Sequence, residues 1–176
     1  APTKALEFDL PVEQGEVRVE GDVCYLSLVE RHRGTGAVVN GFVSGFGYTG
    51  SMAIASSVAH DSHHMIVVGT NQEMMAAAAN RLGEIGGGVS VWKDGSEVAL
   101  VELPIAGLMS DSKASEVAVK AQAIVTAMID CGCTLNNAYM QHTLLALVVI
   151  PELRISDLGL VDVNRFELTE VLESNS

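Results

Sequence analysis

The stretch Ala55-Ser-Ser-Val-Ala-His-Asp-Ser-His-His-Met-Ile-Val-Val-Gly69 decides the fold. It contains the end of one apolar run, 52–58, and the whole of a second, 65–68. Both runs are short and bounded by glycine or small residues, which predicts two buried strands. The polar residues between them, 60–64, are therefore expected in a loop held between two core strands. Loops on rigid scaffolds often carry function, so chemistry is expected here.

Patterns on both sides of this stretch predict the neighbouring elements. Residues 1–15 form a lead-in, and alternation predicts strands over 16–20, 22–31 and 37–43, followed by a glycine-rich loop at 44–50. After the stretch, Thr70 or Asn71 is expected to cap a helix that ends at 86–88. The predicted inner face of this helix consists of Met74, Ala78, Leu82 and Ile85.

The second half of the chain mixes hairpins and helices. Asp94-Gly95 predicts a hairpin between strands at 89–92 and 98–103, because this pair supplies the positive φ angles of such turns. A longer helix is expected over 113–130. Its predicted inner face consists of Val117, Ala121, Ile124, Val125, Met128 and Ile129. Beyond it, we expect a polar connection with Asn136-Asn137 and 139–142, a buried strand or short helix at 143–150, a hairpin at 155–163 and a terminal strand at 166–168. The sum is an α+β fold with mixed or antiparallel sheet layers and two main helices.

The composition argues against a nucleic-acid-binding, a membrane-spanning and a disulfide-stabilised protein. The 176 residues carry 10 basic and 22 acidic side chains, a formal charge of -12, which argues against nucleic acid or an anionic membrane as partner. No apolar run reaches the roughly 18 to 20 residues that span a bilayer. Three cysteines make a poor disulfide framework, and Cys131-Gly-Cys133 is expected to be a reduced pair at a helix end, although such a pair can also bind soft metals. A cytoplasmic protein is the expectation.

The polar loop is the first candidate site. His60 and His64 are four residues apart, as in the H-E-x-x-H zinc motif, but Asp61 stands where the motif has glutamate and the flanks are strand-like. The weak metal-ligand candidates are His60, His63 and His64. Ser62 as a nucleophile is the weaker idea, because residues adjacent in sequence rarely reach catalytic geometry. The alternative is structural, with the imidazoles and Asp61 bonded to backbone.

Other polar or glycine-rich positions have plain structural interpretations. Residues 86–88 follow a helix rather than precede one, so a helix stop is expected and not a phosphate loop. Arg31-His32-Arg33 is a small basic spot that can meet an anionic partner or a neighbouring domain, but a solvated turn is the favoured interpretation. Asp111 and Glu116 are interpreted as first-turn helix acids. The methionines Met74, Met75 and Met128 are expected in the core.

Long strings of this chain resemble the C-terminal domain of bacterial adenine deaminases. They cover nearly the whole chain in order and include Val29-Glu-Arg-His-Arg-Gly-Thr-Gly36, Gly41-Phe-Val-Ser-Gly-Phe-Gly47, Ala53-Ile-Ala-Ser-Ser-Val-Ala-His-Asp-Ser-His63, Leu103-Pro-Ile-Ala-Gly-Leu-Met-Ser-Asp111 and Val149-Ile-Pro-Glu-Leu153. One departure is visible. The family string usually reads His-Asp-Ser-His-Asn, whereas this chain has His64 at the last place.

The resemblance implies a role within a larger enzyme of the amidohydrolase superfamily. Members hydrolyse adenine to hypoxanthine and ammonia in purine salvage, with iron or manganese, sometimes zinc, in a TIM-type barrel. That barrel would lie upstream of residue 1, with 1–15 as lead-in and 16–176 as the C-terminal domain. The H-x-H metal motif of the barrel is absent from this chain.

The resemblance leaves three roles open for the chain in a homo-oligomeric enzyme. In the first, the candidates His60, Asp61, Ser62 and His63 reach the mouth of the barrel and help close or support the active site. In the second, the domain is purely structural or forms a dimer interface. In the third, it is a non-catalytic module that binds purine or metal.

Overall fold

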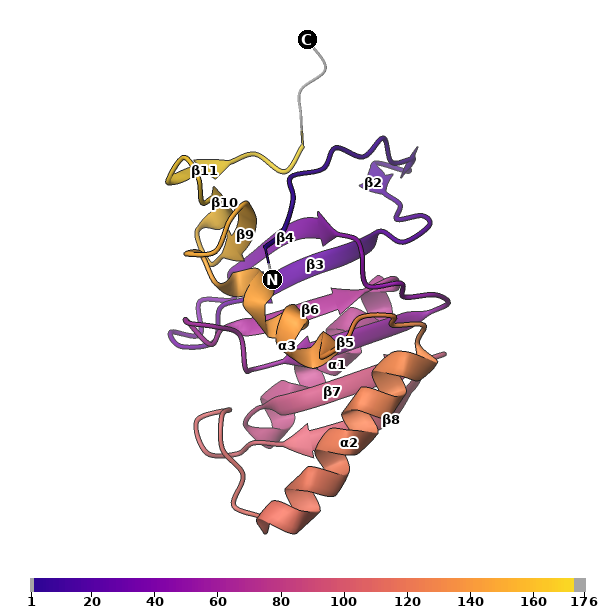
Figure 1. Cartoon of the computed structure of the whole chain (residues 1–176), viewed down its shortest axis with the longest axis vertical. Helices are drawn as coiled ribbons and strands as arrows, with labels where there is room; N and C mark the ends of the chain where they lie inside the picture. Colours follow the sequence, from indigo (N-terminus) through magenta and orange to yellow (C-terminus); the bar gives the residue numbers. More distant parts are fainter. Residues whose placement is uncertain (1, 173–176) are drawn as a thin grey trace.

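The computed structural model describes residues 2–172 and is built around one six-stranded sheet (Figure 1). The strand order is β4-β3-β6-β5-β7-β8, and every pair is antiparallel. The strands are β3 (Cys24–Val29), β4 (Val38–Val43), β5 (Met52–Ser56), β6 (Met65–Gly69), β7 (Gly88–Lys93) and β8 (Ser96–Glu102). With helices on both faces of this sheet, the α+β prediction is confirmed.

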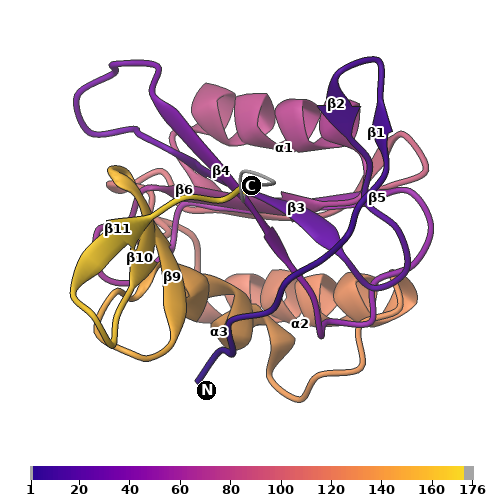
Figure 2. The same ribbon diagram turned by 90° about the horizontal axis from the view of Figure 1, so that it is seen from above.

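The two apolar runs that flank the polar loop form the central hairpin of the sheet. Every residue of β5 and β6 is buried, because both faces of these strands are covered. Helix α1 (Gln72–Ile85) lies on one face, and α2 (Ala114–Asp130) with α3 (Ala138–Thr143) lies on the other (Figure 2). The strand predictions for this stretch are therefore confirmed, and residues 57–64 join the two strands.

Helix α1 begins and ends where its capping residues predict. The Asn71 side chain accepts a hydrogen bond from the Met74 N–H at 2.9 Å, and Gly86 closes the helix with φ of 82°. Met74, Ala78 and Leu82 are buried as predicted, together with Met75. The interpretation of 86–88 as a helix stop is confirmed.

Helix α2 corrects two predictions. Ile124 and Met128 are buried, as is Ala127, but Val125 and Ile129 are exposed, and so is Ala121. The apolar periodicity of this helix is wider than the face that packs on β7 and β8, so periodicity alone does not locate the buried face. The helix also begins at Ala114, so the interpretation of Asp111 as a first-turn acid is wrong, whereas Glu116 does lie in the first turn.

The segment after α2 differs from the expectation at 139–142. These residues lie in α3 rather than in a polar connection, and a 3₁₀ turn follows over Leu144–Ala146. Leu145 and Ala146 are buried, whereas Val149 is exposed, so 143–150 is a short helical turn and not a strand. His142 is fully buried, and burial lowers its pKa to about 3, which keeps the imidazole neutral.

Two small antiparallel sheets complete the fold. One pairs β1 (Val12–Glu13) with β2 (Glu16–Val17), which is shorter than the strand predicted at 16–20. The other has the order β11-β10-β9 and consists of β9 (Leu153–Ser156), β10 (Gly159–Asp162) and β11 (Glu167–Thr169), close to the predicted hairpin and terminal strand. Among residues 2–172, no helix has both the length and the apolar character needed to cross a bilayer.

Candidate functional site

Three segments meet at one end of the six-stranded sheet, which we call the loop end. They are the turn 30–37 after β3, the histidine loop 57–64 between β5 and β6, and the connector 104–109 after β8. Strand register brings them together, because Val29 pairs with Met65, Ser56 with Val89, and Gly88 with Glu102. In Figure 1 the connector leaves β8 at the left and leads to α2.

The histidine loop divides its histidines between two environments. The rings of His60 and His63 lie edge to face with centroids 5.3 Å apart, and both side chains are partly exposed. Asp61 and Ser62 are exposed between them. His64 is buried and packs instead on the ring of His32, with centroids 4.6 Å apart. The four candidates at 60–63 are thus at least partly exposed, whereas His64 is buried.

His63 is held in one orientation by its own loop. Its backbone has φ of 52°, a left-handed conformation that is unusual for a residue with a side chain. Its Nδ1 accepts a hydrogen bond from the Ala59 N–H at 3.3 Å, so the neutral ring carries its proton on Nε2. Burial lowers the pKa of His63, and the neighbouring His60 and Arg31 lower it further. A neutral imidazole can donate a hydrogen bond through its Nε2–H. Once that proton has been transferred, the same nitrogen can accept a proton.

Arg31 and His32 fasten the histidine loop from outside. The Arg31 guanidinium donates to the carbonyl of His63 at 2.5 Å and to that of Ala106 at 2.9 Å, and His32 Nε2 lies 2.6 Å from the carbonyl of Ser62. The favoured interpretation of this basic spot as a solvated turn is therefore wrong for Arg31, which is partly buried, whereas His32 and Arg33 are exposed. The contacts join residues about thirty and more positions apart in sequence, and no local pattern signals them.

Glu30 organises the turn that carries Arg31. Its carboxylate accepts hydrogen bonds from the backbone N–H groups of Thr35, Arg33 and His32, at 3.0, 2.8 and 2.6 Å, and from the Thr35 hydroxyl at 2.9 Å. The backbone bonds from Thr35 and Arg33 are the main reason that the pKa of Glu30 falls to about 2. The charged form of Glu30 is thus part of the folded site.

Replacing Glu30 with glutamine is expected to lower the melting temperature at pH 7, and the difference from the unmodified chain should shrink as pH falls. The sign follows from the lowered pKa: the stabilisation by the carboxylate is fully present above its unfolded pKa near 4.5 and is lost as pH falls towards 2. Thermal melts of both chains between pH 7 and pH 3 check this. The exposed Glu20, changed to glutamine in the same way, serves as control. A difference that stays constant with pH contradicts the assignment.

The connector is seated on the sheet end by close backbone contacts. Ser57 donates through its hydroxyl to the carbonyl of Gly107 at 2.7 Å and accepts from the Gly88 N–H at 2.8 Å. A methyl group on Gly87 would lie 2.4 Å from the Gly107 Cα, and one on Gly107 would lie 2.9 Å from the Arg31 guanidinium. The glycines of these segments therefore allow the connector to lie directly against the histidine loop.

The residues weighed as metal ligands do not form a ligand set. His64 Nε2 lies 3.7 Å from an Asp157 oxygen and its Nδ1 lies 3.9 Å from a Glu30 oxygen, while His63 Nδ1 faces the backbone. Across residues 2–172, no group of three or more His, Cys, Asp or Glu side chains is arranged to hold a metal ion. The three cysteines are free and buried.

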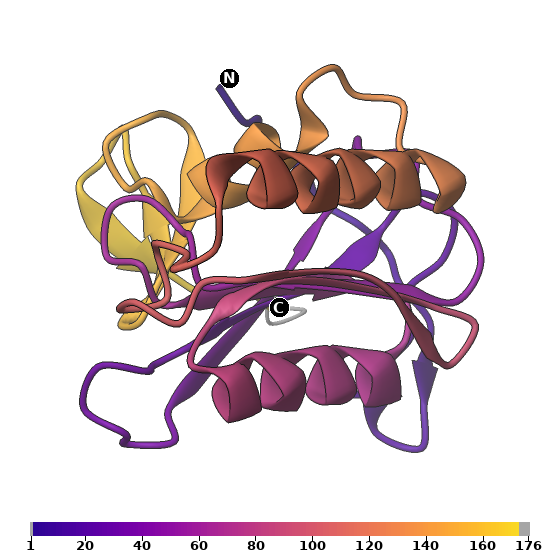
Figure 3. The same cartoon turned by 90° about the horizontal axis from the view of Figure 1, so that it is seen from below.

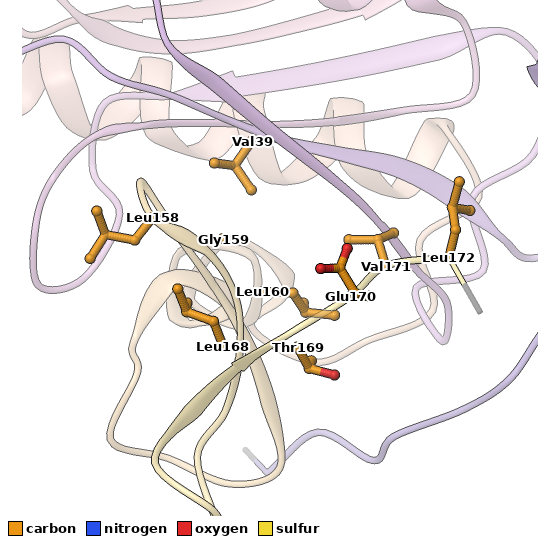
Figure 4. A pocket seen from close by; sticks show the side chains of 9 residues that line it. All are labelled: Val39, Leu158, Gly159, Leu160, Leu168, Thr169, Glu170, Val171 and Leu172. Carbon is orange, nitrogen blue, oxygen red and sulfur yellow. The ribbon is translucent and has the colours of Figure 1, made fainter. Parts of the chain in front are cut away.

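Two hollows of the surface lie away from the histidine loop. A cavity of about 410 Å³ lies between β4 and the β10–β11 hairpin (Figure 4), and its lining is mostly aliphatic. A second hollow, of about 590 Å³, lies beside α1 over β3 and β4. Neither is lined by a residue of the histidine loop.

Comparisons with known proteins show that the chain matches part of longer proteins. A family model described as the adenine deaminase C-terminal domain matches residues 1–167. The chain is 72% identical over 172 residues to an adenine deaminase of Paracoccus denitrificans, 71% over 176 residues to one of Ruegeria pomeroyi, and 44% over 172 residues to one of Moorella thermoacetica. These matches cover 97–98% of the chain but only 29% of each relative.

Proposed function

Because this chain belongs to the family of adenine deaminase C-terminal domains, we propose that it works as the C-terminal domain of a metal-dependent enzyme that converts adenine and water to hypoxanthine and ammonia. The observation that carries the proposal is the match at 72% identity over 98% of the chain to a protein named adenine deaminase. The chain spans 29% of that protein, so the proposal assigns most of the catalytic machinery to the remainder.

The proposal assigns the metal, which is manganese or iron and in some family members zinc, to an upstream barrel domain. His60, His63 and His64 do not fit a metal, because His64 is turned to Asp157 and Glu30 and His63 Nδ1 is bonded to the backbone. No step through the metal is therefore assigned to this chain.

The histidine loop is proposed to complete the active site at the mouth of that barrel. His63, neutral and with its proton on Nε2, is suited to hydrogen-bond a purine nitrogen or to relay a proton, and the partly exposed ring of His60 lies beside it. Asp61 and Ser62 are exposed in the same loop. Arg31 and the connector hold this loop in place, which is the preorganisation that a closing loop requires.

The same proposal includes the compartment, the oligomeric state and the domain boundaries of the enzyme. The enzyme is placed in cytoplasmic purine salvage as a homo-oligomer, with 1–15 as the lead-in from the upstream domain and 16–176 as the C-terminal domain. The free, buried thiols of Cys24, Cys131 and Cys133 support a reducing compartment.

The isolated 176-residue chain is expected to release no ammonia from adenine, with or without added manganese or iron. The intact protein, supplied with the same metal, is expected to produce hypoxanthine and ammonia in equal amounts. A coupled ammonia assay with product chromatography checks both. Turnover by the isolated chain would overturn the assignment of the metal centre, and an intact protein that does not deaminate adenine would overturn the proposed activity.

A further inference from the structure

Helix α2 carries an exposed apolar stripe beside its buried face. Its members are exposed, and their spacing of four, three, four and four residues places them on one side of the helix. They are Ala114, Ala118, Ala121, Val125 and Ile129, which we call the α2 stripe. Val125 is 42% exposed and Ile129 is 60% exposed. A surface of this kind on a separated domain marks a contact with something else.

The position of the stripe follows from the salt bridge on the other side of the helix. Lys120 Nζ lies 2.6 Å from a carboxylate oxygen of Glu102, on the edge strand β8. Ile124 and Met128 are buried against the sheet. Around the helix axis, these two residues lie between Lys120 on one side and the stripe on the other. The stripe therefore turns away from the edge of the sheet and towards its middle, where α3 lies on the same face (Figure 3).

A second apolar surface lies at the loop end, next to the histidine loop. Ile105 is 45% exposed, Leu108 is 36% exposed and Met109 is 58% exposed, although Arg31 and Ser57 fasten the backbone of this connector. Three exposed apolar side chains on a firmly held turn are not explained by packing within the chain. Residues 110–113 link the connector to Ala114, the first residue of the stripe.

The polypeptide enters on this same face of the sheet. Thr3 is fixed to β9 and the turn before it: its N–H donates to the carbonyl of Pro151 at 3.0 Å and its hydroxyl to that of Leu153 at 2.8 Å. Figure 3 places the N-terminal end beside α3, on the side of the sheet opposite α1. Polypeptide that precedes Thr3 in the longer relatives would thus join the domain on the face that carries the α2 stripe.

We propose that the α2 stripe and the connector form the surface on which the upstream domain of the same polypeptide docks, an inference that rests on the proposed function. The occupant is an uncharged, apolar patch of that domain, and docking would hold the histidine loop at its active site. The stripe alone is about 22 Å long, from 1.5 Å per residue, and no wider than the helix at about 10 Å, so its area is well below the roughly 800 Å² per partner of a stable dimer. A domain on the same chain needs less area, because covalent linkage supplies a high effective concentration.

Cysteine labelling in the intact enzyme tests this surface. Val125→Cys and Ile129→Cys place a thiol in the stripe, and Val119→Cys is the matched control, because Val119 is 72% exposed on the outer side of the same helix. The native thiols of this chain are buried, so a maleimide probe followed by peptide mass analysis reports each introduced thiol separately. We expect labelling at 125 and 129 to be at least tenfold slower than at 119, and this ratio to stay unchanged on dilution and in the monomeric fraction.

Each other outcome overturns the docking proposal. Equal labelling at 119, 125 and 129 means that the stripe is free in the intact enzyme. Protection that disappears when the oligomer dissociates assigns the stripe to a second copy of the chain. Neither result depends on turnover, so the labelling experiment can disprove the docking proposal without bearing on the proposed deaminase activity.

Discussion

Changing both His60 and His63 to alanine in the intact enzyme is expected to lower kcat/KM for adenine by about a hundredfold or more, which corresponds to about 2.7 kcal/mol of lost transition-state stabilisation. The two rings are adjacent, accessible and held by a fastened loop, and His63 is poised as a neutral donor. Steady-state kinetics, with metal content and melting temperature measured on the same preparations, checks the prediction.

The control for this prediction comes from the same loop. His64 is buried against His32, whereas His60 and His63 are partly exposed. The resemblance to the family places asparagine at this position, so His64→Asn is expected to keep kcat/KM close to that of the unmodified enzyme. Near-normal turnover of the double alanine variant, with folding and metal intact, would mean that the loop is structural and that the domain serves as scaffold or interface.

Changing Gly88 to alanine is expected to destabilise the chain by about 3 kcal/mol or more and to lower its melting temperature by about 6–12 °C. Gly88 has φ of 151°, and a methyl group there would lie 2.1 Å from the carbonyl oxygen of Val101 in the paired strand. Both groups are backbone, so the contact cannot be relieved by rotating a side chain. The change would also separate β7 from β8 next to Ser57, which hydrogen-bonds the Gly88 N–H.

Gly83 provides the matched glycine control. It lies exposed within α1, and a methyl group there would meet no atom within 4 Å. Gly83→Ala is therefore expected to stabilise the chain by about 0.5–1 kcal/mol, because alanine restricts the unfolded chain and favours helix. Thermal melts followed by circular dichroism compare the two variants. Equal and small effects would contradict the close packing of β7 on β8.

The sequence predicts the parts of this fold that depend on local rules. The strands at 52–56 and 65–69 are continuous apolar runs, the Asn71 cap and the Gly86 stop frame α1, and Asp94-Gly95 marks the hairpin. Each of these signals acts within a few residues. The family resemblance is likewise confirmed by the comparisons, because long strings of sequence survive between relatives.

The parts that sequence does not predict depend on contacts between distant segments. Val125 and Ile129 fit a helical apolar face, yet the sheet covers only the neighbouring side of α2. Arg31 has the composition of a solvated turn, yet its partners are the carbonyls of His63 and Ala106. His142 belongs to a polar-looking string but is fully buried. The local sequence pattern does not reveal which distant segment of the chain packs on a given residue.

The strand order also determines the sequence in which the strands can pair while the chain is being synthesised on the ribosome. The β3–β4 hairpin emerges first, but the inner edge of β3 has no partner until β6 is complete at Gly69. In the β5–β6 hairpin, whose turn is the histidine loop, β6 then pairs with β3. The free edge of β5 stays unpaired until β7 has been synthesised. Helix α2 covers β7 and β8 last. A long pause of translation between residues 43 and 102 would therefore expose an unpaired strand edge to neighbouring chains.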